Sequence, residues 1–154
     1  MTIPDPVNLL QRVRDRLAAA AVFDRVEVAA DNLRAYPKLA ESQAWYEVSA
    51  DDNDRLWVGL YTPDRWLSES IEADLMHQGD KIEDLLEDEL IDQGFDQRLA
   101  VDHFRDEELR YVFRSRVEVD RRQAEAAERL ARVVLAYDAC FSQLGDMSPQ
   151  DETV

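Results

Sequence analysis

The side chains that could bind a metal are few and widely spaced. His77 and His103 are the only histidines, and the chain has no His-x-x-x-His, Cys-x-x-Cys or His-Glu-x-x-His spacing. The acidic run 51–54 resembles the start of a calcium loop, but Arg55 and Leu56 stand where a ligand and a glycine are needed. We therefore predict a turn at 51–54 and no metal site.

The chain also lacks the residue patterns that usually support covalent catalysis or phosphate binding. The chain has no Gly-x-Ser-x-Gly sequence and only four glycines, too few for a glycine-rich phosphate loop. Cys140 lies in the apolar pattern of a helix, where a thiol is usually an inert small hydrophobe. Asp102 and His103 adjoin on a predicted strand and point to opposite faces, which favours a structural histidine over an acid–base cluster with Arg110. We predict no catalytic residue and no cofactor.

Two alternating segments predict the first hairpin. Residues 44–49 and 56–61 flank the acidic turn, and pairing them gathers apolar side chains on one face. The expected partners are Val48 with Leu56, Tyr46 with Val58, Ala44 with Leu60 and, on the other face, Trp45 with Gly59. One face suffices for a core, so Trp45, Trp57 and Tyr61 on the second face form a candidate protein-binding patch, unless a layer of helix covers them.

Residues 109–119 show the clearest strand pattern. Apolar side chains alternate there with Arg110, Arg114 and Arg116, so one face is expected in the core and the arginines are expected on the other. We predict that residues 98–104 pair with this strand. The expected partners, around a turn at 105–107, are Leu99 with Phe113, Val101 with Tyr111 and Asp102 with Arg110.

Capping residues, prolines and glycines mark the ends of the expected helices. The helices are expected from Pro6 to about Val22, from Thr62 to Gly79, from Asp80 to Gly94 and from Asp120 to about Leu144. A short strand is expected over 25–29 and a loop over 33–41. This order, α-β-β-β-α-α-β-β-α, predicts an α+β fold: a mostly antiparallel sheet of about five strands with helices packed on it. We expect one domain over 1–147 and a polar tail over 148–154.

The expected core follows from the apolar faces of these elements. Its predicted members are Leu10, Leu17, Val48, Leu56, Val58, Leu60, Leu99, Val101, Tyr111, Phe113, Leu130, Val134 and Phe141. The C-terminal helix has an apolar stripe that is wider than is needed to pack against one neighbouring element. It therefore packs either wholly within its own domain or partly on a second copy, as a homodimer.

The composition limits which binding partners and which cellular compartment we expect for the protein. Thirty-four acidic residues against eighteen basic ones give a net charge of −16, so the surface repels nucleic acid and anionic membranes. Solubility or a basic protein partner explains such acidity. No apolar stretch approaches the ~20 residues that span a bilayer. One cysteine and the lack of a signal-peptide pattern lead us to expect a cytoplasmic protein.

The expected acidic helix offers a partner for the arginines of the strand over 109–119. Seven carboxylates lie within residues 80–92 against a single lysine. We expect them either to be solvated or to pair with Arg110, Arg114 and Arg116, within one molecule or across a dimer.

The order of elements, rather than a sequence motif, resembles that of the bacterial type III secretion chaperones and the related sensory-transduction-regulator-like proteins. The shared frame is a helix, three strands, helical material, two strands and a long C-terminal helix, and the low isoelectric point is similar. The resemblance implies a non-enzymatic protein of the bacterial cytosol that dimerises and binds a segment of a partner polypeptide. The alternative is a small enzyme or small-molecule binder with an acidic and arginine pocket.

Overall fold

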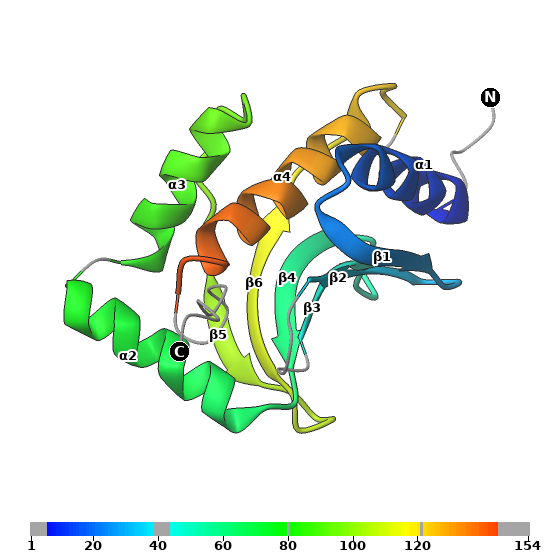
Figure 1. Cartoon of the computed structure of the whole chain (residues 1–154). Coiled ribbons are helices and arrows are strands. Elements are labelled where there is room, and N and C mark those ends of the chain that lie inside the picture. Colours follow the sequence, from blue (N-terminus) through cyan, green and yellow to red (C-terminus); the bar gives the residue numbers. More distant parts are fainter. Residues whose placement is uncertain (1–5, 39–43, 80, 121, 145–154) are drawn as a thin grey trace.

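The computed structural model describes residues 6–38, 44–79, 81–120 and 122–144. It has four helices and one six-stranded sheet (Figure 1). In chain order the elements are α1 (Pro6–Ala20), β1 (Phe23–Val28), β2 (Asn32–Pro37), β3 (Trp45–Ala50), β4 (Leu56–Thr62), α2 (Arg65–Gln78), α3 (Ile82–Asp92), β5 (Asp102–Arg105), β6 (Tyr111–Val117) and α4 (Ala126–Phe141). The predicted α+β class is confirmed.

The sheet is antiparallel throughout, in the order β1-β2-β3-β4-β6-β5. It has one strand more than predicted, because β2 replaces the loop expected over 33–41. Leu33 and Ala35 are buried and alternate with the half-buried Arg34 and Tyr36, which is the pattern of a strand with one face in the core. Pro37 ends the strand, where a missing N–H breaks little of the pairing.

The first hairpin forms with a register shifted by two residues from the prediction. Tyr46 lies opposite Leu60, and Trp45 lies opposite Tyr61 rather than Gly59. The turn at 51–54 is confirmed, since the Asp51 carboxylate accepts hydrogen bonds from the N–H groups of Asn53 and Arg55. A shift of two leaves every side chain on its predicted face.

The second hairpin also forms, and its predicted register is wrong. Asp102 lies opposite Arg114 instead of Arg110, and Tyr111 pairs with Arg105 rather than Val101. The turn is longer than expected because the Asp106 carboxylate accepts hydrogen bonds from the N–H groups of Glu108 and Arg110. Leu109 within it has a left-handed φ of 64°. Leu99, expected to pair with Phe113, lies outside β5, and His103 takes its place.

The helix ends agree with the expected signals in part. Asp64, rather than Thr62, caps α2 by accepting from the N–H groups of Trp66 and Leu67, and Gly79 ends it with a φ of 72°. The C-terminal helix begins at Ala126, six residues after the expected Asp120, whose carboxylate instead accepts from the Arg122 N–H. Asp80 and the predicted polar tail over 148–154 lie outside the described residues.

The core lies between the sheet and α4, which crosses it (Figure 1). Phe141 of α4 packs on Phe113 of β6 at 5.2 Å between ring centroids, and the hydroxyls of Tyr137 and Ser115 share a hydrogen bond of 2.5 Å. Helices α1 and α3 flank α4 within the same chain. The wide apolar stripe of α4 is thus covered without a second copy.

The predicted core is confirmed except at two positions. Val101 and Tyr111 are half-buried, because Val101 precedes the edge strand β5 and Tyr111 opens β6 beside the turn. The other expected core residues are buried. No helix within the described ranges is long and apolar enough to cross a membrane.

Candidate functional site

The two faces of the sheet are covered in different ways. The helices pack on the face that carries Tyr46, Leu60 and Phe113, which we call the helix-covered face (Figure 1). The strand register places a different set of side chains on the opposite face. We call that side the arginine–aromatic face, defined by Arg25, Arg34, Tyr36, Trp45, Glu47, Trp57, Tyr61, Phe104, Arg110, Arg114 and Arg116.

All six residues predicted for protein binding lie on the arginine–aromatic face. Trp45 stacks with Tyr61 at 6.4 Å between ring centroids. Trp57 lies opposite Arg116 across the β4–β6 pair, and the same strand carries Arg114. None of the described helices packs across these side chains, so the layer of helix that could have covered them is absent from this part of the chain.

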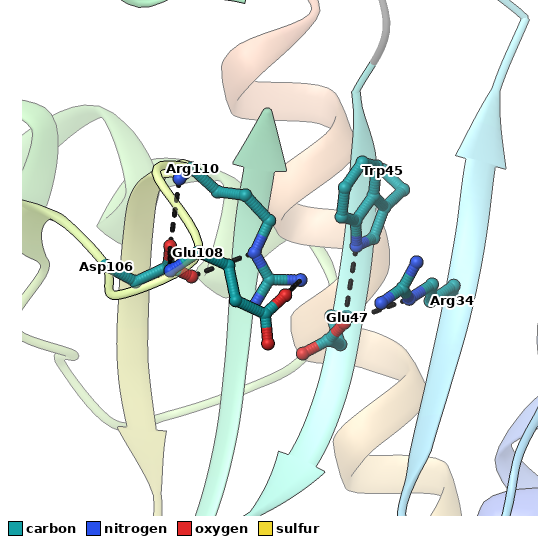
Figure 2. Close-up of polar contacts among 6 residues, drawn as sticks. All are labelled: Arg34, Trp45, Glu47, Asp106, Glu108 and Arg110. Carbon is teal, nitrogen blue, oxygen red and sulfur yellow. Dashed lines mark hydrogen bonds and ion pairs between the residues drawn. The ribbon is translucent and has the colours of Figure 1, made fainter. Parts of the chain in front are cut away.

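Glu47 forms the polar centre of this face (Figure 2). Its carboxylate accepts hydrogen bonds from Arg34 Nε at 3.1 Å and from Trp45 Nε1 at 3.3 Å. Glu47 is only 6% exposed, although no described helix covers it. Burial raises the pKa of Glu47, while the Trp45 hydrogen bond and the charges of Arg34 and Arg110 oppose the rise. The carboxylate therefore has its donors within the chain.

Arg110 extends this layer from the turn before β6. Its Nε donates to Asp106 at 2.8 Å, and Nη1 lies 3.6 Å from Glu108 (Figure 2). Its guanidinium carbon also lies 5.0 Å from the centre of the Tyr61 ring and 5.8 Å from the centre of the Trp45 ring. Such cation–π contacts attract the guanidinium to the ring faces. The aromatic patch is therefore covered by arginines rather than by helix.

Arg114 has a different environment from the other arginines of this face. Its guanidinium carbon lies 4.0 Å from the Trp57 ring centre and 4.9 Å from that of Phe104. Its Nε is buried without a hydrogen-bond partner. Among the ion pairs of the described residues, none involves Arg114, although Asp102 lies opposite it in the register. Arg114 is held by aromatic rings instead of by a carboxylate.

Gly59 permits this arrangement of Arg114. Gly59 pairs with Arg114 across β4 and β6, and a Cβ atom added at Gly59 would lie 2.7 Å from both the Arg114 Cβ and the Phe113 carbonyl oxygen. Real Cβ atoms almost never approach so closely. The glycine thus lets the β6 backbone and the base of the Arg114 side chain approach β4.

The predicted pairing between the acidic helix and the arginines is wrong within one molecule for the described part of that helix, residues 81–92. Helix α3 packs against α4, and its Asp84 and Glu87 bind Arg98 at 2.8 Å and 2.6 Å. Arg116 instead lies 3.7 Å from Glu118, which directly follows the end of β6 at Val117. A pairing of the acidic helix with these arginines across a dimer stays a prediction.

A second polar site lies in a groove of about 530 Å³ between α2 and the β5–β6 hairpin. Its polar side chains include Arg65, Glu69, Glu72, His103 and Arg105. One ring nitrogen of His103 hydrogen-bonds Glu72 at 2.5 Å, the other bonds the Val112 carbonyl at 2.9 Å, and the ring stacks on Phe113. The groove is wide open to solvent, and both nitrogens of His103 have partners, which agrees with a structural histidine.

The other side chains considered for catalysis or metal binding have structural environments. Cys140 is buried, and burial raises the pKa of its thiol to about 12, so little reactive thiolate forms near neutral pH. Within the described ranges no cluster of three or more His, Cys, Asp or Glu side chains could hold a metal ion. The Asp51 carboxylate of the acidic turn binds the Trp57 Nε1 at 3.0 Å, which lowers the pKa of Asp51.

Five members of the face were missed by the sequence prediction: Arg25, Arg34, Tyr36, Glu47 and Phe104. Arg34 was assigned to a loop, although its alternation with Leu33 and Ala35 was a usable signal. Glu47 is two residues from Trp45 on the same strand, so the alternation places both on one face. Its partner Arg34 lies on β2, which the sequence prediction did not include. Phe104 was placed on a strand whose register was wrong.

Comparison with protein families, with curated proteins and with solved structures finds no match for the chain. The function is therefore argued from the chemistry of the site.

Proposed function

We propose that the chain is a non-enzymatic protein-binding module of chaperone or adaptor type, which binds a segment of a partner polypeptide on the arginine–aromatic face. One observation carries this proposal: a sheet face that none of the described helices covers holds Trp45, Trp57 and Tyr61 together with Arg110 and Arg114. Aromatic residues and arginine are enriched in protein interfaces and dominate their binding energy.

The contacts within the face favour binding because they hold the side chains before a partner arrives. Arg34 is fixed between Glu47 and the Trp45 ring, whose centre lies 4.6 Å away. Arg110 is fixed by Asp106 in the same way. A surface whose long side chains are already ordered loses less conformational entropy on association.

The small enzyme or small-molecule binder stays the alternative, and the groove beside α2 is the observation that favours it. His103 and Glu72 line it together with Arg105. Against it, the groove is open to solvent, and the carboxylate with a raised pKa on the sheet, Glu47, is already bound by Arg34 and Trp45. Catalytic carboxylates with raised pKa values generally lie in a cleft that can admit a substrate.

Several finer points stay predictions beside this proposal. They are the cytoplasmic location, the resemblance to the type III secretion chaperones, a basic partner and a homodimer through α4. The coverage of α4 by α1 and α3 removes the feature that motivated the homodimer. A partner that binds the arginines also need not be basic.

The test is affinity capture from the cytosol of the source organism with three forms of the chain, read by quantitative mass spectrometry. Trp57→Ala removes a ring of the face, and Trp66→Ala removes a tryptophan on α2 that is 76% exposed. We expect proteins captured by the wild-type and Trp66→Ala chains to be lost with Trp57→Ala, provided that circular dichroism shows all three folded. Equal capture by the three forms would contradict the proposal.

A further inference from the structure

We infer that the polypeptide segment bound on the arginine–aromatic face carries a carboxylate side chain, and that Arg114 is the residue that binds it. This inference rests on the proposed function and names the chemistry of the partner. It follows from the difference between Arg114 and the other arginines of the face.

The other arginines already have carboxylates within the chain. Arg34 binds Glu47, Arg110 binds Asp106, Arg116 lies near Glu118, and Arg25 lies 3.3 Å from Glu27. Arg114 is the exception on this face among the described ion pairs, in a chain with 34 acidic residues against 18 basic ones. An arginine left without a carboxylate in such an acidic chain is a position where an external carboxylate finds charge complementarity.

The rings around Arg114 prepare it for this role. The guanidinium carbon of Arg114 lies 4.0 Å from the Trp57 ring centre and 4.9 Å from that of Phe104, and these contacts restrict the movement of the group. A guanidinium held in this way loses less conformational freedom when its N–H fork binds the two oxygens of a carboxylate. Arg114 is half-buried, so an incoming carboxylate would be partly shielded from water, and its attraction to the arginine would be stronger than on an open surface.

The surroundings limit how acidic the bound segment can be. Glu47, Asp102 and Glu118 lie on or beside the face, and the whole chain carries a charge of −16. A polyanion would be repelled by these charges. A segment with one carboxylate next to aromatic or aliphatic side chains meets Arg114 and the rings of Trp45 and Trp57 with much less repulsion.

The experiment is a selection of random dodecapeptides displayed on phage, carried out on the intact wild-type chain. Selected peptides are then made with their acidic residue as Glu and as Gln, and their affinities are compared by fluorescence anisotropy. We expect Asp or Glu beside apolar residues in the selected peptides, and about a tenfold weaker binding of the Gln form to the wild-type chain. Arg114→Gln should abolish that difference, and Arg114→Lys should recover only part of it.

Arg129→Gln is the matched control. It removes the same charge from an arginine of α4, outside the arginine–aromatic face, whose guanidinium carbon likewise lies near an aromatic ring, 4.7 Å from the ring centre of Phe95. We expect this variant to keep the preference for the Glu form. An equal loss in both variants would overturn the role of Arg114, since it would indicate a general field effect.

The outcomes separate this inference from the proposed function. If no peptide is selected, or if the selected peptides bind Trp57→Ala as well as the wild-type chain, the proposed function fails and the inference falls with it. If peptides bind through the face without a preference for Glu over Gln, only the inference fails. A single-stranded dodecanucleotide that binds more tightly than the peptides would overturn both.

Discussion

The two faces of the sheet are closed by different chemistry. On the helix-covered face, Phe113 and Leu60 are buried beneath α4, and burial of apolar surface is the main stabilising effect. On the arginine–aromatic face, side chains of the strands lie across one another, as Arg34 does over Trp45. The first arrangement uses a second layer of backbone, and the second is one side chain thick. We expect that a partner can open a layer of that kind without unfolding the chain.

The energies of the two faces should differ accordingly. A buried aromatic side chain contributes a few kcal/mol to stability, whereas a cation–π contact at an exposed site contributes ~0.5–1 kcal/mol. The helix-covered face should therefore dominate folding, and the arginine–aromatic face should dominate binding.

The largest expected effect is on the helix-covered face. Phe113→Ala should lower the free energy of unfolding by ~3–5 kcal/mol, because it leaves a cavity beneath Phe141. Trp57→Ala, at a half-buried position on the arginine–aromatic face, should lower the free energy of unfolding by clearly less. Urea unfolding followed by circular dichroism measures both. Equal losses would break the comparison between the faces.

The next effect tests the point where the arginine–aromatic face is most closely packed. Gly59→Ala should lower the free energy of unfolding by ~1–3 kcal/mol, because the new methyl group meets the Phe113 carbonyl oxygen and the Arg114 Cβ. Ser49→Ala, at a half-buried position on the same face, should change it by less than ~0.5 kcal/mol. Similar values for both variants would show that β4 and β6 approach each other less closely than described.

A third prediction concerns two carboxylates, one on each side of the sheet, whose pKa is raised by partial or full burial. Burial raises the pKa of Asp138 on α4, and the Tyr46 hydroxyl opposes the rise only in part. The folded chain then holds this proton more tightly than the unfolded chain does. The contribution of Asp138 is thus most favourable below the ordinary carboxyl pKa and is lost as the pH rises through the folded-state pKa.

Asp138→Asn should therefore be more stable than the wild-type chain at pH 7, and this difference should disappear toward pH 3. Glu47→Gln should gain much less at pH 7, because Arg34 loses its ion pair when the charge is removed. Thermal unfolding of the three chains between pH 3 and pH 7 measures the difference. An Asp138→Asn chain that is less stable than the wild type at pH 7 would contradict the sign.

The smallest expected effect is a coupling free energy near zero between Arg114 on the arginine–aromatic face and Asp84 on α3. Arg114→Gln and Asp84→Asn should change the free energy of unfolding additively, within ~0.5 kcal/mol, at low and high salt. The control cycle pairs Asp84→Asn with Arg98→Gln, where the ion pair of 2.8 Å should give a coupling that shrinks at high salt. Coupling between Arg114 and Asp84 would revive the pairing of α3 with the arginines, across a dimer.

The sequence predicted the faces of the sheet better than its registers. Alternation has a period of two, so it places Trp45 and Tyr61 on one face whatever their partners are. The register depends on the turn, and the second turn was misplaced because Asp106 binds the N–H groups of two later residues. Strand β2 was missed because Pro37 suggested a loop, and Arg34 was lost from the site with it.

The contacts within the face could not be predicted. Three arginines on one strand look alike in the sequence, and only the packing separates Arg116 near Glu118 from Arg114 between two rings. The role of α3 was mistaken for a similar reason. Its carboxylates were assigned to the most conspicuous arginines, whereas Arg98, near in the chain, lies within their reach.

The positions of the three tryptophans have an optical consequence. Trp45 and Trp57 lie on the arginine–aromatic face, each with its indole N–H bound to a carboxylate, and Trp66 on α2 is 76% exposed. Replacing Trp66 with Phe would leave all the tryptophan emission of the chain in the two indoles of the face. The intensity and wavelength of that emission would then respond directly to any molecule that binds there, so the chain carries its own fluorescent probe at the arginine–aromatic face.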